Sequence, residues 1–495
     1  MYRRVAAMSY EHAPIVVWDQ RARLWSSGSF ATGGSPWGLI RLKPAMQGFA
    51  QELVASGSRG LRPTSESEMR AARALVHRGL AHPQSQQRQH QWDVEVVVPA
   101  HDRVDALDDC LRSLQGFRVL VINDCSQDSS AVNEVVHQRD ARVIVREVNG
   151  GPAAARNTGI AATESEFIAF VDSDCTVPSS LLDALMPLFD DPIVGAVAPR
   201  IRPHIEDDGL TTKFEAVASA LDMGAHAEVV RIGGQLAYLP AAVLIVRRSA
   251  FPEGGFDEEL RLGEDVDFIW RMVEQGWQVR YEPKVIAEHE LRGDFLALIK
   301  RRFDYGTSAV DLDLRHPGAL TPARVSGWNL IAAAGVAMGQ PGIVLSALGT
   351  ATHVLQDKLH REHAPVVLTP FFVGKTLQAD ARAVGHVLRR EYWPIGWMLL
   401  AASPRAKGVH GRVVKLAAAA MVVPLLHEWR TTKPGIDPVR FVGMRLLADA
   451  AYGSGVLVKS AQRRSIRAMK PQVRFPLPAK SVTPSPASDK GVVTS

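Results

Sequence analysis

The residues best suited to chemistry in this chain form an acidic triplet, Asp172-Ser173-Asp174, that directly follows the apolar run FIAFV. An apolar run of this length predicts a buried strand, so both carboxylates reach the loop beyond the end of the sheet. Paired carboxylate oxygens are ligands that a divalent cation prefers, and such a cation keeps open positions for a diphosphate. The D-x-D pattern alone is equally consistent with a solvated loop or a helix cap, and its surroundings decide between these interpretations.

Two earlier apolar runs, VEVVVPA and FRVLVIND, contain or lead into further candidate ligand-binding residues, namely Pro99, His101, Asp102 and Asp124. Between them and the acidic triplet lies the segment NGGPAAARNTGI, in which two glycines and a proline predict a turn that opens a helix. That helix presents Arg156 and Asn157. Backbone N–H groups at a helix N-terminus, with an arginine nearby, are suited to bind a diphosphate.

A second acidic pair, Glu264-Asp265, begins a helical pattern farther along the chain. Acidic residues at a helix start interact favourably with the helix dipole, so a structural role alone would explain the pair. A carboxylate there could also take the proton from an attacking hydroxyl. His289 follows the strand-like runs QVRYEP and KVIAEHE, and its imidazole could either join Asp174 on a cation or have only a structural role.

These residues must be positioned by the region from Val94 to about Asp311, where short β-branched runs alternate with helical patterns. This alternation is typical of an α/β fold with a largely parallel sheet. In such folds ligands gather where strands end and loops begin, which is where the polar residues above are found. We therefore predict an α/β catalytic domain over residues 93–312.

The order of these motifs resembles that of the family 2 glycosyltransferases, which have the Rossmann-like GT-A fold. The matching motifs are V-P-x-x-x after the first strand, D-x-S-x-D after the second, G-x-x-x-x-R-N, D-x-D, and the E-D pair with its following histidine. The chain departs from the family pattern at Asn123, which replaces the first acid of a D-D pair, and at His101, which replaces a tyrosine.

The resemblance implies a role for each motif in a metal-dependent, inverting transfer of a sugar from a nucleotide-sugar donor. His101 would stack on the nucleobase, and Asp124 would bind its uracil ring. Asp174 and His289 would hold Mn²⁺ or Mg²⁺, and Asp265 would act as the general base. The other implied site residues are Pro99, Asp102, Arg156, Asn157, Asp172 and Ser173 for the donor and Glu264 for the acceptor.

Residues 1–82 are predicted to form a small N-terminal module that is separate from the catalytic domain. Its second helical pattern starts with Ser65 and Glu68 in the S-x-x-E spacing of a capping box. The module resembles the PqqD-like winged-helix domains that hold peptide substrates, and a simple packing domain is the alternative. Residues 83–92 are predicted to be a polar linker.

Residues 313–462 are predicted to form a hydrophobic helical region. Between Arg324 and Asp357 there is no charged residue, so the length permits a spanning helix of about 20 residues, but the sequence GQPG from Gly339 interrupts the run. Integral spans, helices lying against the membrane surface and a soluble helical bundle remain open. Residues 463–495 are predicted to be a basic, disordered tail.

The composition is typical of a globular protein, with 46% hydrophobic and 22% charged residues. The three cysteines show no metal-ligand spacing and the N-terminus has no signal-peptide pattern, so we expect a cytoplasmic location. The net charge is +5, and basic residues gather near the C-terminus. This distribution suits association with the inner face of the cell membrane, and we expect no nucleic acid partner.

The arrangement of the whole chain resembles that of the glycosyltransferases of the mycofactocin system, including the segment RRFDYGTSA after the catalytic motifs. This resemblance implies UDP-glucose as the donor and a β-linked oligoglucoside built on a redox cofactor made from a ribosomal peptide. One alternative is a membrane polysaccharide synthase or a polyprenyl-phosphate sugar transferase. The other is a non-catalytic protein that binds a nucleotide sugar or a peptide.

Overall fold

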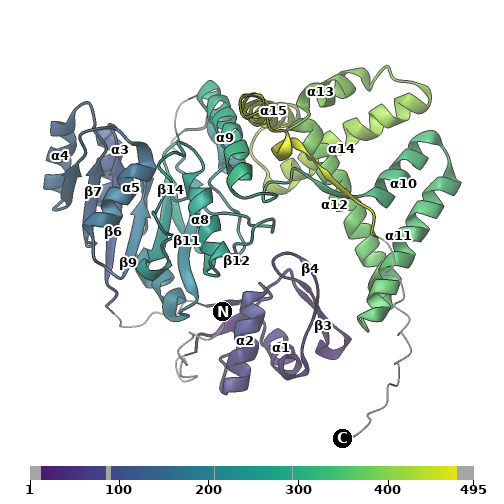
Figure 1. Cartoon of the computed structure of the whole chain (residues 1–495), viewed down its shortest axis with the longest axis horizontal. Helices are drawn as coiled ribbons and strands as arrows, with labels where there is room; N and C mark the ends of the chain where they lie inside the picture. Colours follow the sequence, from purple (N-terminus) through teal and green to yellow (C-terminus); the bar gives the residue numbers. More distant parts are fainter. Residues whose placement is uncertain (1–12, 85–90, 206, 292–293, 477–495) are drawn as a thin grey trace, which may run out of the picture.

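The computed structural model describes residues 13–84, 91–205, 207–291 and 294–476. Figure 1 shows three parts: an N-terminal module in purple, a sheet with helices in blue and teal, and C-terminal helices in green and yellow. The N-terminal module lies beside both of the other parts.

The N-terminal module combines small antiparallel sheets with two helices. Its elements are β1 (Val16–Trp18), β2 (Arg23–Trp25), β3 (Phe30–Gly33), β4 (Gly38–Arg41), α1 (Pro44–Ser56), α2 (Glu66–His77) and β5 (Ala81–Pro83). Strands β2, β3 and β4 form one sheet, and β1 pairs with β5. Glu68 donates its backbone N–H to Ser65 Oγ at 3.3 Å, which confirms the predicted helix start. The winged-helix assignment stays a prediction, and residues 85–90 of the predicted linker lie outside the described residues.

The catalytic region is built on a nine-stranded sheet in the order β10-β14-β11-β13-β9-β6-β7-β8, with β12 paired to β14. Its strands are β6 (Val94–Ala100), β7 (Val119–Asn123), β8 (Arg142–Val145), β9 (Phe167–Val171), β10 (Cys175–Thr176), β11 (Val194–Pro203), β12 (Glu228–Val229), β13 (Val243–Arg247) and β14 (Gln278–His289). Strand β6 is parallel to both β7 and β9, and β11 is parallel to β14, whereas β10, β12 and β13 run antiparallel to their neighbours. This topology confirms the predicted α/β fold and corrects the expected largely parallel sheet to a mixed one.

Both faces of this sheet are buried. Along β9, Phe167, Ala169 and Val171 belong to one core cluster, whereas Ile168 and Phe170 belong to the cluster on the opposite face. The covering helices are α3 (Val104–Ser113), α4 (Ser129–Gln138), α5 (Gly151–Ala162), α6 (Leu181–Leu185), α7 (Leu210–Ala218) and α8 (Glu264–Glu274). At the centre of the sheet, in β6, β7 and β9, neither face meets water, so these strands are apolar runs and the polar site residues follow at their ends.

The C-terminal region is helical, as predicted. Its helices are α9 (Phe295–Arg315), α10 (Gly327–Met338), α11 (Pro341–Arg361), α12 (Thr369–Arg389), α13 (Trp393–Ala402), α14 (Gly408–Thr432) and α15 (Pro438–Arg463). The uncharged run after Arg324 does not form one helix, because Gly339 adopts a φ of +68° and separates α10 from α11. Among the described helices, α14 and α15 are long and apolar enough to cross a membrane by length and composition.

The start of the C-terminal tail is ordered, so the prediction of a disordered tail from residue 463 is wrong for residues 464–476. Strand β16 (Gln472–Arg474) pairs in parallel with β15 (Arg324–Ser326). Trp328 Nε1 donates to the carbonyl oxygen of Pro476 at 3.0 Å, and the Trp328 ring packs edge-on against Phe475. Composition did not predict this order because the pairing strand lies far away along the chain. Residues 477–495 lie outside the described residues.

Direct contacts join the three parts. Arg21 Nη2 of the N-terminal module lies 2.5 Å from Glu228 Oε1 in the catalytic region, and Trp37 packs 5.8 Å from Phe372 of α12 between ring centroids. Helices α9 and α15 pack so closely that a Cβ atom on Gly306 would lie 2.0 Å from the carbonyl oxygen of Tyr452. The C-terminal helices are therefore anchored on the helix that follows the catalytic motifs.

Candidate active site

The loops after β6 and β7 are fastened together by Asp102. Its backbone N–H donates to Ser126 Oγ at 2.9 Å, and its carboxylate accepts from the backbone N–H of Gln127 at 2.8 Å. Pro99 lies within β6, opposite Ile122 of β7. Asp102 has a φ of +56°, a conformation that these contacts hold in place. Asp102 and Pro99 therefore fix the ends of β6 and β7, which position His101 and Asp124.

Asp124 fixes the start of helix α5 next to His101. Its buried carboxylate accepts hydrogen bonds from the backbone N–H groups of Gly150 (3.1 Å) and Gly151 (2.7 Å) and from Arg146 Nη1 (2.9 Å). The backbone oxygen of Asp124 lies 3.1 Å from His101 Nδ1. The side chain of His101 is 45% exposed, so its ring is open to a flat ligand. The resemblance-based role of Asp124 on a uracil ring stays a prediction.

Arg156 of α5 joins the two acidic motifs. Its Nη2 donates to Asp172 Oδ1 at 2.8 Å and its Nη1 to Glu264 Oε1 at 2.9 Å. The guanidinium is buried and lies 5.3 Å from the centroid of the Phe256 ring. This single cation brings Asp172 and the Glu264-Asp265 pair into one site and offsets part of their charge.

Asn157, the neighbour of Arg156, turns away from these carboxylates. Its amide nitrogen donates to the carbonyl oxygen of Phe256 at 2.9 Å, and its amide oxygen accepts from the Phe256 N–H at 2.8 Å. Both halves of the amide are thus occupied by the loop that precedes α8. The structure gives Asn157 a role in holding this loop, and it does not bring Asn157 to the other predicted donor-binding residues.

Asp174 and His289 meet at the edge of the sheet. Strand β10 pairs antiparallel with β14 so that Cys175 lies opposite His289, and His289 Nε2 lies 3.5 Å from Asp174 Oδ2. Arg103 Nη1 lies 3.1 Å from the same oxygen, and its Nη2 lies 2.5 Å from Glu290. Burial lowers the pKa of His289, which favours the neutral imidazole. Ser173, between the two carboxylates, lies in the turn that presents them.

The Asp174–His289 pair has the chemistry of a two-ligand cation site. A carboxylate oxygen and a neutral imidazole are ligands that Mn²⁺ accepts, and the phosphates of a donor can supply further oxygens. Among the residues that the structure describes, no three His, Cys, Asp or Glu side chains come together as a ready-made site. These residues therefore fit a cation that is held jointly by the protein and a diphosphate.

Glu264 and Asp265 begin α8 and lie close together in a low-dielectric setting. Burial raises the pKa of Glu264 to about 7, and the Asp265 charge adds to this rise while Arg156 opposes it. Burial also raises the pKa of Asp265, again against the effect of Arg156. Asp265 Oδ2 accepts the backbone N–H of Ala241 at 3.3 Å, which orients the carboxylate. A carboxylate whose pKa is raised towards neutrality is suited to accept a proton.

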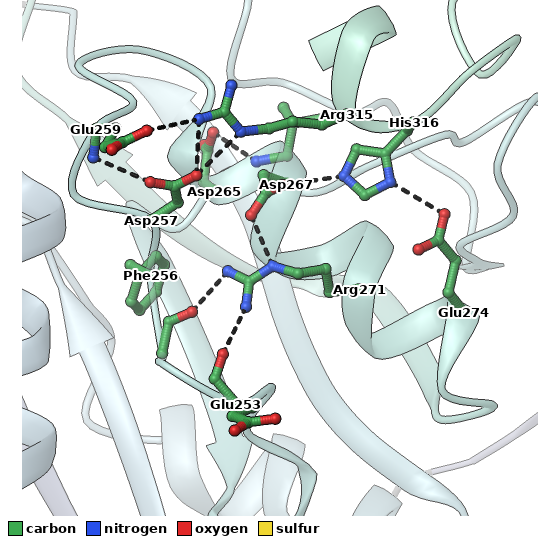
Figure 2. Close-up of polar contacts among 12 residues, drawn as sticks. Glu253, Phe256, Asp257, Glu259, Asp265, Asp267, Arg271, Glu274, Arg315 and His316 are labelled. Atoms are coloured by element: carbon green, nitrogen blue, oxygen red, sulfur yellow. Dashed lines mark hydrogen bonds and ion pairs between the residues drawn. The ribbon is translucent and has the colours of Figure 1, made fainter. Parts of the chain in front are cut away.

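The rest of α8 is fastened to the end of α9, as Figure 2 shows. The His316 ring bridges two carboxylates, with Nε2 3.0 Å from Asp267 and Nδ1 3.0 Å from Glu274. Arg315 pairs with Asp257, in the loop before α8, at 2.9 Å. These contacts fix the axis of α8 and therefore the position of Asp265 at its start.

A pocket of about 310 Å³ adjoins this site. It is lined by His289 together with residues of α7, the following loop and α9, among them Glu215, Leu221, Arg301, Arg302 and Tyr305. Two arginines beside His289, a candidate cation ligand, make the pocket suited to a phosphate-bearing ligand.

Comparison with known proteins decides the family. Residues 95–255 match the model of glycosyl transferase family 2. Over 469 residues the chain is 34% identical to the pre-mycofactocin glycosyltransferase of Mycobacterium tuberculosis, a similarity that covers 92% of this chain and 97% of the relative. This chain belongs to the family 2 glycosyltransferases.

Other similarities of this glycosyltransferase are weaker. It is 23% identical to the poly-β-1,6-N-acetyl-D-glucosamine synthase of Staphylococcus epidermidis, over 39% of this chain and 49% of that one. A solved mannosyltransferase from Pyrobaculum calidifontis, in complex with GDP-mannose and Mn²⁺, aligns with a TM-score of 0.41 at 16% identity and covers 76% of this chain and 89% of its own. Family membership and the sheet topology together confirm the predicted GT-A fold.

Sequence reasoning missed several residues of the glycosyltransferase site. Arg103 directly follows the H-D motif, and its charge next to a predicted ligand-binding turn was an available signal. Arg301 and Tyr305 belong to the RRFDYGTSA segment, to which the sequence pattern assigns no role in the site. Ala241 contributes only a backbone N–H, for which no side-chain pattern exists.

Proposed function

We propose that this glycosyltransferase transfers glucose from UDP-glucose to an acceptor hydroxyl, with a divalent metal ion and with inversion at the anomeric carbon. The proposed acceptor is the peptide-derived redox cofactor mycofactocin, on which successive transfers build a β-linked oligoglucoside. The observation that carries the proposal is the similarity to the pre-mycofactocin glycosyltransferase over almost the full length of both chains.

The donor is bound along the strand ends. His101 stacks on the nucleobase, and Asp124, which holds the N-terminus of α5, binds the uracil ring. Asp174 and His289 would hold Mn²⁺ or Mg²⁺, which when bound offsets the negative charge that develops on the departing diphosphate. Arg103, which contacts Asp174 in the structure, would then supply a cation for a phosphate oxygen.

Asp265 accepts the proton of the acceptor hydroxyl. The hydroxyl oxygen forms a bond to the anomeric carbon while the bond between that carbon and the diphosphate oxygen breaks. Attack from the face opposite the diphosphate inverts the centre, so an α-linked donor gives a β-linked product. Glu264, held by Arg156, binds the acceptor beside the base. The raised pKa of the buried acidic pair supports this assignment.

We place the reaction in the cytoplasm at the inner face of the cell membrane. The three cysteines are free in the structure, which agrees with a reducing compartment. The apolar helices α14 and α15 support contact with a membrane.

The test is turnover of radiolabelled nucleotide sugars by the purified protein, with and without Mn²⁺. We expect UDP-glucose to be consumed in preference to UDP-galactose, UDP-N-acetylglucosamine and GDP-mannose, and only with the metal. Preferred turnover of another donor, or full turnover after exhaustive chelation, would contradict the proposal. With acceptor present, label in a water-soluble peptide-derived product supports it, and label in the lipid extract favours a polyprenyl-phosphate sugar transferase instead.

A further inference from the structure

Two helical hairpins of the C-terminal region end side by side, at the right of Figure 1. Helices α10 and α11 turn at Gly339, and α13 and α14 turn at residues 403–407. The tips touch each other: a Cβ atom on Gly339 would lie 2.5 Å from Arg412 Nη1, near the start of α14. The two turns and the helix ends next to them, residues 334–346 and 395–416, are called the hairpin tips below.

Large apolar side chains of the hairpin tips are exposed. On the first hairpin Val336 is 50% exposed and Leu345 is 71% exposed, and on the second Met398 is 63% and Val413 is 50% exposed. Only 22% of the most apolar stretch of α14 is buried inside the protein. A core helix would hide most of such a stretch, so this apolar surface is suited to a partner outside the chain.

The hairpin tips also carry an unbalanced positive charge. From Tyr392 to His427 the sequence contains four Lys or Arg residues and no Asp or Glu. The four cations, all exposed, are Arg405, Lys407, Arg412 and Lys415. An apolar surface bordered by cations complements a leaflet with anionic headgroups. A second copy that docked through the same surface would bring like charges together, which disfavours a symmetric dimer.

The lengths of the helices limit how deep the tips can reach. Helix α13 has 10 residues and α10 has 12, which corresponds to about 15 and 18 Å. The hydrocarbon core of a bilayer is about 30 Å thick, so neither hairpin is long enough to cross it.

Helix α14 is long enough to cross, but its packing partners are charged. Arg389 of α12 donates from Nη1 to the carbonyl oxygen of Met421, in the middle of α14, and from Nε to Asp449 of α15 at 2.8 Å. A Cβ atom on Gly385 would lie 1.9 Å from the Ala420 carbonyl oxygen, so α12 and α14 cannot be pulled apart without losing this contact. A spanning α14 would carry the Arg389–Asp449 pair to the centre of the bilayer, at a high energetic cost.

We infer that the protein docks on a membrane that contains anionic lipid by laying both hairpin tips in the interfacial region of a single leaflet, and that α14 and α15 do not span. The docking is monotopic, with the exposed apolar side chains turned towards the acyl chains and the four cations at the headgroups. Only the choice of leaflet rests on the location proposed above. The docking itself is independent of the donor, the acceptor and the catalytic residues.

Flotation of the full-length protein with phosphatidylcholine vesicles, with and without phosphatidylglycerol, tests the inference. We expect binding to the anionic vesicles that weakens with salt. The double variant Met398→Glu with Val413→Glu should not float with the vesicles. The single variants Arg405→Ser and Lys407→Ser each lose one positive charge, and each should bind about 5-fold more weakly. Val439→Glu is the matched control, because Val439 is 80% exposed on α15 outside the hairpin tips. Equal loss in the control, or equal binding to neutral vesicles, would overturn the inference.

Two further measurements separate the other possible occupants and a span. In the absence of lipid, light scattering should show a monomer. A dimer that dissociates in the variant with Met398→Glu and Val413→Glu would identify a second copy as the partner. In vesicles, a Lys407→Cys variant should react with an impermeant maleimide added on the side of the bound protein and not with one enclosed in the vesicles, compared with the parent protein. Labelling from the far side would show a span. Donor turnover should be unchanged in all these variants. A failure of the membrane-docking inference can therefore be distinguished from a failure of the proposed function.

Discussion

The guanidinium of Arg156 lies 2.9 Å from the carboxylate of Glu264, and both side chains are buried. Because the same guanidinium also pairs with Asp172, the acidic motif after β9 and the acidic pair of α8 share one cation. The cation permits several carboxylates to lie together without full mutual repulsion, and it makes their charges interdependent.

Replacement of Arg156 should therefore destabilise the fold as well as the site. Arg156→Met leaves Glu264 buried without its partner, and we expect a loss of about 3 kcal/mol or more in the free energy of unfolding, measured by urea denaturation. Arg139→Met is the matched control, since Arg139 pairs with Asp108 at the surface, and it should cost much less. Equal losses would show that the Arg156 pair contributes no more than a surface pair.

Asp265→Asn should abolish transfer and retain donor binding. The amide has nearly the shape of the carboxylate and can remain near the Ala241 N–H, but it cannot accept the acceptor proton. Turnover should fall by at least about 100-fold, as expected for loss of a general base, while the affinity for UDP measured by calorimetry stays within a few-fold. Lost UDP binding with intact turnover would assign Asp265 to the donor instead.

Transfer should depend on pH through the acidic pair. Burial raises the pKa of Glu264 to about 7 and also raises the pKa of Asp265, so a falling pH protonates the acidic pair and removes the base form. The value of kcat should therefore fall as the pH falls through the range in which the pair is protonated, and it should level off above that range. Glu264→Gln removes a negative neighbour, so Asp265 loses its proton more easily and the acid limb should move to lower pH. A limb that stays in place would show that another group controls it.

Metal affinity should depend on Asp174 and His289. Asp174→Ala and His289→Ala should each raise the Mn²⁺ concentration for half-maximal turnover by more than about 10-fold, the loss typical even of residues that only orient a ligand. His204→Ala is the matched control, because His204 lies next to His289 in the sheet edge but pairs with Glu288 at the surface. An equal effect in the control would point to a general disturbance of this edge.

The contact between α9 and α15 should tolerate no methyl group. A Cβ atom on Gly306 would lie 2.0 Å from the Tyr452 carbonyl oxygen, so Gly306→Ala should destabilise the protein by about 1–3 kcal/mol in urea denaturation. Gly443→Ala on α15 is the control, because nothing lies within 4 Å of its Cβ position. It should stabilise by up to about 1 kcal/mol, since alanine favours the helix. A stabilising Gly306→Ala would disprove the close packing.

Local patterns predicted the parts of this protein that local physics decides. The buried run FIAFV and the acids after it identified β9 and its loop, because a strand covered on both faces must be apolar and must release polar residues at its end. The S-x-x-E spacing identified the start of α2 because a serine at this position can accept a hydrogen bond from a free N–H group of the first helical turn. Family resemblance then supplied the roles that remain proposals.

Contacts between distant segments were outside the reach of those patterns. The partners of Arg156 and Asn157 depend on where α8 and its preceding loop pack, and the ordered start of the tail depends on β15. Ala241 acts through its backbone, which every residue type carries. Tertiary packing determines such pairings, and local sequence patterns do not predict them.

Because α9 and α15 pack closely together, the predicted domain boundary at residue 312 does not separate two parts that can move independently. Tilting of the C-terminal helices must carry α9 with it, and with α9 the side chains of Arg301 and Tyr305 at the pocket. A chain cut at that boundary would expose the flank of α9 around Gly306 to water and should aggregate when expressed. Any division of the protein into parts must therefore keep α9 and α15 together.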